Sequence, residues 1–121
     1  MRKLNRFAIK HILRTTRNFE GKNLSGLDLA GFNFSHARLW YADLSGANLA
    51  GVNFAHADLT GANLTCTNLA GANLSAAQLD ETIFDETNLT GVYLGEFVFD
   101  TDIDERNSQF NNPKPQYAQT A

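Results

Sequence analysis

Leucine or phenylalanine recurs at every fifth position over most of the chain. The series contains seventeen consecutive members. They are Phe19, Leu24, Leu29, Phe34, Leu39, Leu44, Leu49, Phe54, Leu59, Leu64, Leu69, Leu74, Leu79, Phe84, Leu89, Leu94 and Phe99. Because an α-helix turns by about 100° per residue, a spacing of five would distribute these side chains around the whole helix. A continuous strand fails as well, since an odd spacing alternates between the two faces of a sheet.

These apolar side chains can share one interior only if the chain turns a corner about every five residues. A slower repeat of twenty residues gives the number of corners, because segment 31–37 (GFNFSHA) aligns with segment 51–57 (GVNFAHA). This alignment places Phe34 over Phe54, at the ~4.8 Å spacing of neighbouring β-strands. The sequence therefore predicts an all-β solenoid whose coils have four sides of five residues each.

We number each side from its central Leu or Phe, position i. Position i−2 is mostly Ala, Val or Thr and is predicted to point inward as well. The exceptions Leu27, Phe32 and Phe97 are large and are expected in the outermost coils, where a further element can cover them. Lys22 occupies the same position and cannot be interior, so the β-helix of about four coils is predicted to span residues 18–104.

Polar residues recur with the same period. Asn or Asp stands at i−1 on twelve of the seventeen sides, and Gly is frequent at i+2. Short polar side chains bond nearby backbone groups, and Gly tolerates the positive φ that tight corners need. Both observations favour a regular series of turns.

Segments 42–46 (ADLSG), 47–51 (ANLAG) and 62–64 (ANL) resemble the A-[D/N]-L-x-x motif of the pentapeptide-repeat family. The resemblance covers residues 18 to about 102 and implies a right-handed quadrilateral β-helix. It implies little about function, because most members have no assigned activity. A minority that resembles bacterial quinolone-resistance proteins inhibits DNA gyrase by mimicking DNA. This chain differs from that minority in having fewer coils, no long loop within the repeats and no obvious C-terminal dimerisation helix.

Residues 1–17 are predicted to form a basic amphipathic helix that caps the solenoid. The apolar positions at helical spacing are Leu4, Phe7, Ala8, His11 and Ile12, flanked by Ile9 and Leu13. A cap is expected because the first coil otherwise exposes its core and its backbone edge. Attachment of the same face to a membrane surface and a targeting peptide are the alternatives. Residues 105–121 are rich in Asn and Gln and are predicted to form a polar C-terminal tail.

Charge is unevenly distributed along the 121 residues. Residues 1–22 carry +6 and the remainder −9, for a net charge of −3. With 43% hydrophobic residues, this composition excludes a disordered polyanion and an evenly basic nucleic-acid binder. A single cysteine, Cys66, and the absence of a long apolar run favour a cytoplasmic protein. Neither nucleic acid nor a membrane is expected as a partner, and the expected oligomeric state is a monomer or an end-to-end dimer.

Chemistry-bearing residues are scarce. Inward-facing Leu and Phe leave no internal pocket, and only three His and one Cys could perform acid–base or nucleophilic chemistry. No enzyme activity and no cofactor are therefore predicted. His36 and His56 could hold a metal together with Glu96, two coils further on. Because two His without a nearby third ligand are typical of solvated side chains, no metal site is predicted.

Candidate interaction residues lie on the outer faces. Trp40 and Tyr41 occupy successive outward positions, and an exposed aromatic pair favours contact with a partner, unless a terminal element covers it. Arg38 and Asp58, one coil apart, are expected to form a surface ion pair. Nine acidic residues and no Lys or Arg lie between positions 80 and 105. The acidic candidates are Asp80, Glu81, Asp85, Glu86 and Asp100.

The predicted function is a non-enzymatic, rigid scaffold for protein–protein interaction with an unknown protein partner. The alternative is a DNA-mimic inhibitor of a DNA-binding enzyme such as gyrase. A duplex carries charge along its whole length, at about one phosphate per 1.7 Å of axis. The acidic run lies toward one end of the chain, which favours the scaffold.

Overall fold

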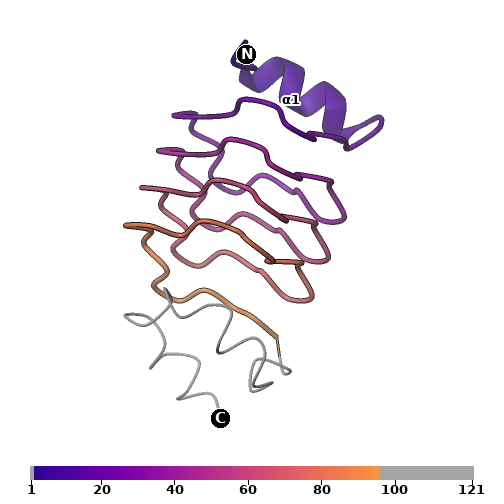
Figure 1. Ribbon diagram of the computed structural model, residues 1–121. Coiled ribbons are helices and arrows are strands. Elements are labelled where there is room, and N and C mark those ends of the chain that lie inside the picture. Colours follow the sequence, from indigo (N-terminus) through magenta and orange to yellow (C-terminus); the bar gives the residue numbers. More distant parts are fainter. Residues whose placement is uncertain (1, 96–121) are drawn as a thin grey trace.

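The structure, a computed structural model, describes residues 2–95. One helix, α1 (Arg6–Leu13), lies at the amino end, and the chain then winds into stacked coils (Figure 1). Thirteen isolated parallel β-bridges link the coils, each between residues twenty apart, and residues 2–95 contain no longer strand. The predicted coil of four five-residue sides is thus confirmed for this part of the chain. Some predictions concern residues outside this described range, namely Glu96, Phe97, Phe99, Asp100 and residues 105–121.

Side chains at position i fill the interior. Every one from Phe19 to Leu89 is buried, and the half-buried Leu94 packs against the same core. Phe34 and Phe54 stack with their ring centroids 5.5 Å apart, as the repeat of twenty predicts. Burial of this continuous apolar column is the main force that stabilises the coils.

Each corner has a left-handed residue at i+2, and fourteen of the fifteen are closed by a hydrogen bond from the N–H of residue i+3 to the carbonyl of residue i. After Leu39, for example, the N–H of Ala42 donates to the Leu39 carbonyl at 3.0 Å. The φ angle at i+2 lies between 55° and 75° at all fifteen corners from Gly21 to Gly91. Glycine occupies eight of these corners, as predicted, and other residues occupy seven. In the left-handed region a residue with a Cβ costs about 1–2 kcal/mol.

Ala76→Gly is expected to stabilise the protein by about 0.5–1 kcal/mol. Ala76 is exposed and has a φ of 59°. Removal of its Cβ relieves about 1–2 kcal/mol of steric cost, which exceeds the ~0.5–1 kcal/mol entropic cost of an added glycine. Urea denaturation measures the effect. Gly71→Ala is the reverse control, because Gly71 has a φ of 71° and an added Cβ would meet no other atom within 4 Å. An Ala76→Gly midpoint at or below that of the wild type would rule out strain at the corners.

The Asn and Asp side chains at i−1 fasten each side to the next corner. All twelve accept a hydrogen bond through Oδ1 from the backbone N–H of residue i+1. For Asn53, this bond from the N–H of Ala55 is 2.9 Å long. The backbone N–H of residue i+1 takes no part in the hydrogen bonds between coils, so the Asn or Asp side chain is its hydrogen-bond partner. The turn chemistry predicted from the sequence is confirmed.

Helix α1 is shorter than the sequence predicted. Asn5 caps it, with its side-chain Oδ1 accepting the N–H of Ala8 at 2.8 Å. The residues before the cap are extended, and Lys3 pairs with Asn23 of the first coil. The prediction of a helix throughout residues 1–17 is therefore wrong, because a good N-cap residue starts the helix later.

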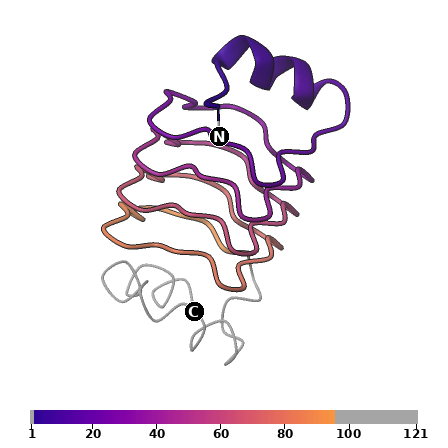
Figure 2. The same ribbon diagram turned by 45° about the horizontal axis from the view of Figure 1, so that its top comes forward.

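The predicted apolar face of the helix is confirmed at Leu4 and Ile12, which pack against the core, and is wrong at Phe7 and His11. Ile9 is completely buried, and Ile12 and Leu13 pack against the core. Phe7 is 80% exposed, and His11 is exposed as well. Positions 9, 12 and 13 lie on one side of a helix and position 7 on the other. Figure 2 shows α1 lying across the end of the first coil.

Candidate interaction surface

Trp40, Tyr41, Asp80 and Glu81 lie on one corner of the solenoid, although in the sequence they form two separate features. The register comes from inter-coil hydrogen bonds of 2.9 Å, from Tyr41 N–H to the Thr60 carbonyl and from Gly61 N–H to the Asp80 carbonyl. The acidic pair is therefore two coils from the aromatic pair, about 10 Å along the axis. We define the Trp40 corner as Trp40, Tyr41, Thr60, Gly61, Asp80 and Glu81.

Trp40 is held by its polar edge. Its indole Nε1–H donates to Oδ2 of Asp58. The other oxygen of this carboxylate, Oδ1, accepts from the N–H and the hydroxyl of Thr60 at 3.0 and 2.6 Å. Trp40 is still 37% exposed. The ring is thus fixed in place and open to a partner.

The expected ion pair between Arg38 and Asp58 is wrong. The backbones of the two residues do pair, as the register predicts. Within residues 2–95, however, the Asp58 carboxylate bonds to Trp40 and Thr60 and forms no ion pair with Arg38. The neutral donors occupy both carboxylate oxygens, and an exposed ion pair would add little.

Tyr41 is fixed by its backbone and by packing. It has a left-handed φ of 55°. Its ring lies against Gly61 of the next coil, in the space that a Cβ at that position would need. The side chain is 62% exposed. Six other corners carry a non-glycine residue with a similar φ, so the conformation belongs to the repeat and sets where the Tyr41 ring lies.

Carboxylates lie on both sides of the aromatic pair along this corner. Asp80 and Glu81 are exposed two coils further on. Glu20 is exposed one coil earlier, beside Gly21, whose N–H donates to the Trp40 carbonyl at 2.7 Å. Aromatic faces and carboxylates both attract cations. The corner is therefore chemically suited to Lys and Arg side chains.

The remaining acidic candidates do not join the Trp40 corner. Asp85 and Glu86 lie at the next corner of the same coil. There Sγ of Cys66, one coil earlier, donates a hydrogen bond to Oε1 of Glu86 at 3.8 Å. Asp100 lies outside the described residues. The predicted interaction residues within residues 2–95 thus divide between two corners.

His36 and His56 stack on another corner. Their ring centroids are 4.8 Å apart and their planes differ by 3°, which confirms the predicted register. The nitrogen lone pairs of an imidazole lie in its ring plane, so two parallel stacked rings cannot point at one ion. Among the described residues, no group of three or more His, Cys, Asp or Glu could hold a metal.

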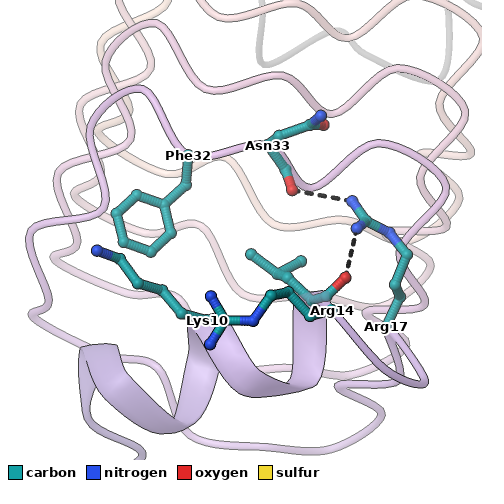
Figure 3. Close-up of a pocket in the computed structure, with 6 residues that line it drawn as sticks. Lys10, Arg14, Arg17, Phe32 and Asn33 are labelled. Atoms are coloured by element: carbon teal, nitrogen blue, oxygen red, sulfur yellow. Dashed lines mark hydrogen bonds between the residues drawn. The ribbon is translucent and has the colours of Figure 1, made fainter.

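An open groove lies between α1 and the first coil (Figure 3), with a volume of ≈ 310 Å³. Its lining residues are Lys10, Leu13, Arg14, Arg17, Phe32 and Asn33. Lys10 Nζ lies 5.6 Å from the centroid of the Phe32 ring, and the guanidinium carbon of Arg6 lies 5.4 Å from it. Phe32 is half-buried and packs against the core.

Arg17 fastens the carboxyl end of α1 to the first coil. Its side chain donates to the carbonyls of Leu13 at 2.6 Å and of Asn33 and Ser35 at 2.9 Å each. Because all three acceptors are backbone carbonyls, Arg17 stabilises the junction between the helix and the first coil. Sequence reasoning missed it, because a single basic residue between two periodic segments carries no pattern.

Comparison with solved structures shows that this chain is similar to pentapeptide repeat proteins. One from the Arabidopsis thaliana thylakoid lumen is 38% identical, with a TM-score of 0.57; the match covers 58% of this chain and 48% of that chain. This chain thus spans about half the length of that structure. HetL from Nostoc sp., involved in heterocyst differentiation regulation, is 28% identical over 65% of this chain and 35% of that one, with a TM-score of 0.40. QnrB1, a plasmid-mediated fluoroquinolone resistance protein, is 23% identical over 72% of this chain and 44% of its own, with a TM-score of 0.38.

Comparison with curated proteins gives no match. The family model for pentapeptide repeats matches residues 18–54, 28–65 and 57–95, with eight copies. These segments together cover the described coils and well over half of the 121 residues. The solved members imply a right-handed β-helix, in agreement with the stacked coils seen here. The chain belongs to the pentapeptide repeat family.

Proposed function

We propose that the protein is a non-enzymatic scaffold that binds a basic protein partner through the Trp40 corner. The observation that carries this proposal is the exposure of two fixed aromatic rings, Trp40 and Tyr41, on the same corner as Asp80 and Glu81. Aromatic side chains are enriched at protein interfaces and dominate their energetics. Carboxylates on either side would select Lys or Arg from the partner.

Rigidity of the corner favours binding. The aromatic rings are already held by Asp58 and Gly61, so little side-chain entropy is lost when a partner contacts them. The backbone beneath them is fastened to both neighbouring coils. A partner would therefore meet a preorganised surface.

The apolar interior supports a role without catalysis. Leu and Phe fill the coils, and the residues that line the groove beside α1 include no Asp, Glu, His, Ser or Cys. A catalytic site normally combines a concave pocket with convergent titratable groups. The scaffold function needs neither.

DNA mimicry finds less support in the arrangement of charge. The exposed acidic pairs Asp80–Glu81 and Asp85–Glu86 both lie on the last described coil. The opposite end of the solenoid carries the cations of α1. A duplex is negative along its whole length, at about one phosphate per 1.7 Å of axis.

We further infer that α1 acts as a cap, and we expect the protein in the cytoplasm. Buried Ile9 and the partners of Arg17 support the cap. The described residues contain no helix long and apolar enough to cross a membrane. The cytoplasmic location stays a prediction from the single cysteine, and the Arabidopsis relative is a protein of the thylakoid lumen.

Titration with an arginine-rich peptide tests the Trp40 corner. Trp40 is the single tryptophan of the chain, so selectively excited tryptophan emission reports on this corner alone. We expect the peptide to change the emission, and a Gly-Ser peptide of equal length to leave it unchanged. Asp80→Asn/Glu81→Gln should weaken binding roughly tenfold, and Tyr41→Ala roughly fivefold.

The matched control is Asp85→Asn/Glu86→Gln, which removes the same charge from the neighbouring corner. Binding should stay within about twofold of the wild type, because these carboxylates lie away from Trp40. Equal weakening by the two double variants would show unspecific attraction of a cation to an acidic coil. That result would remove the support for a specific corner.

A further inference from the structure

The groove between α1 and the first coil combines apolar and cationic walls (Figure 3). Leu13 and Phe32 are half-buried and pack against the solenoid core, so they give the groove an apolar surface. Lys10 and Arg14 are exposed on α1 or directly after it, and both line the groove. One place therefore offers contacts to an apolar group and to a negative charge.

Four cations surround this groove. Three of them, Lys10, Arg14 and Arg17, are lining residues. The fourth, Arg6, lies over the Phe32 ring, with its guanidinium carbon 5.4 Å from the ring centroid. Within residues 2–95, none of the four forms an ion pair with a carboxylate. Like charges held this close repel one another, so a bound anion would relieve the repulsion.

The acidic residues of the first coil leave the groove positive. Glu20 and Asp28 are exposed on this coil, and neither lines the groove. Oδ1 of Asp28 accepts the N–H of Ala30 at 3.3 Å and the side-chain amide of Asn48 at 3.2 Å. This carboxylate is thus engaged by its own turn and by the next coil. The groove lacks an internal counter-charge among the described residues.

Hydrogen-bond donors are held in place at one end of the groove, where Figure 3 shows Arg17 beside Asn33. The bonds of Arg17 to three carbonyls use three of its five N–H donors and fix the guanidinium. Oδ1 of Asn33 accepts the N–H of Ser35 at 2.9 Å, so its amide nitrogen remains a donor. Bonds from such donors to an anionic oxygen are strong, and fixed donors lose little entropy on binding.

We propose that this groove binds a small organic anion with an aromatic body, such as an aryl-substituted carboxylate. The rings would pack against Leu13 and Phe32, and the acidic group would lie among Lys10, Arg14 and Arg17. The volume of ≈ 310 Å³ is at the small end of the ~300–1,000 Å³ typical of small-molecule sites. One or two rings with a short acidic chain match this size.

The ligand would also fasten the cap. The walls of the groove come from both α1 and the first coil, so the complete site exists only while the helix is docked. A ligand that binds only the folded form stabilises that form. Binding should therefore raise the midpoint of thermal unfolding as well as occupy the groove.

Fluorescence titration of the full chain with anilinonaphthalene sulfonate tests the proposal, because this aromatic anion emits strongly only in apolar surroundings. We expect the emission to rise to saturation. N-Phenylnaphthylamine has the same rings without the sulfonate and should bind at least about tenfold more weakly. Phenylpropionate should displace the dye and raise the unfolding midpoint, and phenylpropanol, its uncharged analogue, should do neither.

Lys10→Gln and Lys22→Gln form a matched pair, since each removes one exposed lysine charge and only Lys10 lines the groove. We expect the first to weaken dye binding about fivefold and the second by less than about twofold. Lys10→Gln/Arg14→Gln should weaken it at least about tenfold. Circular dichroism should show that these exposed substitutions leave the fold unchanged.

Three results would overturn the proposal. Equal weakening by Lys10→Gln and Lys22→Gln would show that the dye follows the overall positive charge of this end of the chain. Equal binding of the sulfonate and of N-phenylnaphthylamine would show an apolar surface that needs no cation. Displacement of the dye by an oligoglutamate peptide at lower concentration than by phenylpropionate would assign the cations to an acidic segment of a protein partner.

Discussion

Phe54→Ala is expected to lower the free energy of unfolding by about 3–5 kcal/mol. Phe54 is completely buried, and its ring stacks on that of Phe34 with a centroid distance of 5.5 Å. Coils lie above and below it, so the backbone ladder prevents the site from collapsing around the cavity. Urea or thermal denaturation followed by circular dichroism measures the loss.

Asn53→Ala provides the control from the adjacent position. Asn53 is half-buried, and its main contribution is the 2.9 Å hydrogen bond to the N–H of Ala55. Loss of this bond should cost about 1 kcal/mol. Equal destabilisation by the two substitutions would mean that the inward and outward positions of the coil have been exchanged.

Deletion of residues 2–16 is expected to make the protein aggregate. The deletion removes Ile9 from the core, the pairing of Lys3 with Asn23, and the Leu13 carbonyl that Arg17 binds. The first coil would then expose apolar side chains and unpaired backbone groups, which promote edge-to-edge association. Size-exclusion chromatography with light scattering measures the effect.

Single substitutions on the two faces of α1 test whether the helix caps the core through its buried side chains. Ile9→Ala should cost about 2–5 kcal/mol, because the side chain is fully buried. Phe7→Ala should change stability by less than about 0.5 kcal/mol, since Phe7 is 80% exposed. A truncated protein that stays monomeric, together with equal effects of the two substitutions, would contradict the capping function.

The coils could be predicted almost completely from the sequence. A period of five for apolar residues and a period of twenty for whole coils specify the register, because each inward side chain must stack on its equivalent in the next coil. The stacking of Phe34 on Phe54 and of His36 on His56 follows from these two periods. The twelve side-chain turns formed by Asn and Asp follow from local chemistry.

The helix and the interaction surface were harder to predict. Eight helical residues contain too few turns to fix which face is buried, and the Asn5 cap shifts the start of the helix. Phe7 was therefore assigned to the core face, although it is exposed. The Trp40 corner combines residues that are forty positions apart in the sequence. They were predicted as separate candidates, and only the twenty-residue register of the coils places them on one corner. The clamp formed by Arg17 depends on three carbonyls and has no sequence signature.

Affinity capture from a lysate of the source organism, with three forms of the protein in parallel, tests the scaffold function most directly. The forms are the wild type, Asp80→Asn/Glu81→Gln with Tyr41→Ala, and the control Asp85→Asn/Glu86→Gln. Mass spectrometry should identify a basic protein that the wild type and the control retain and that the Trp40-corner variant loses. Retention of the same proteins by all three forms would contradict the assignment of this corner, and corner-dependent capture of a topoisomerase would favour DNA mimicry instead.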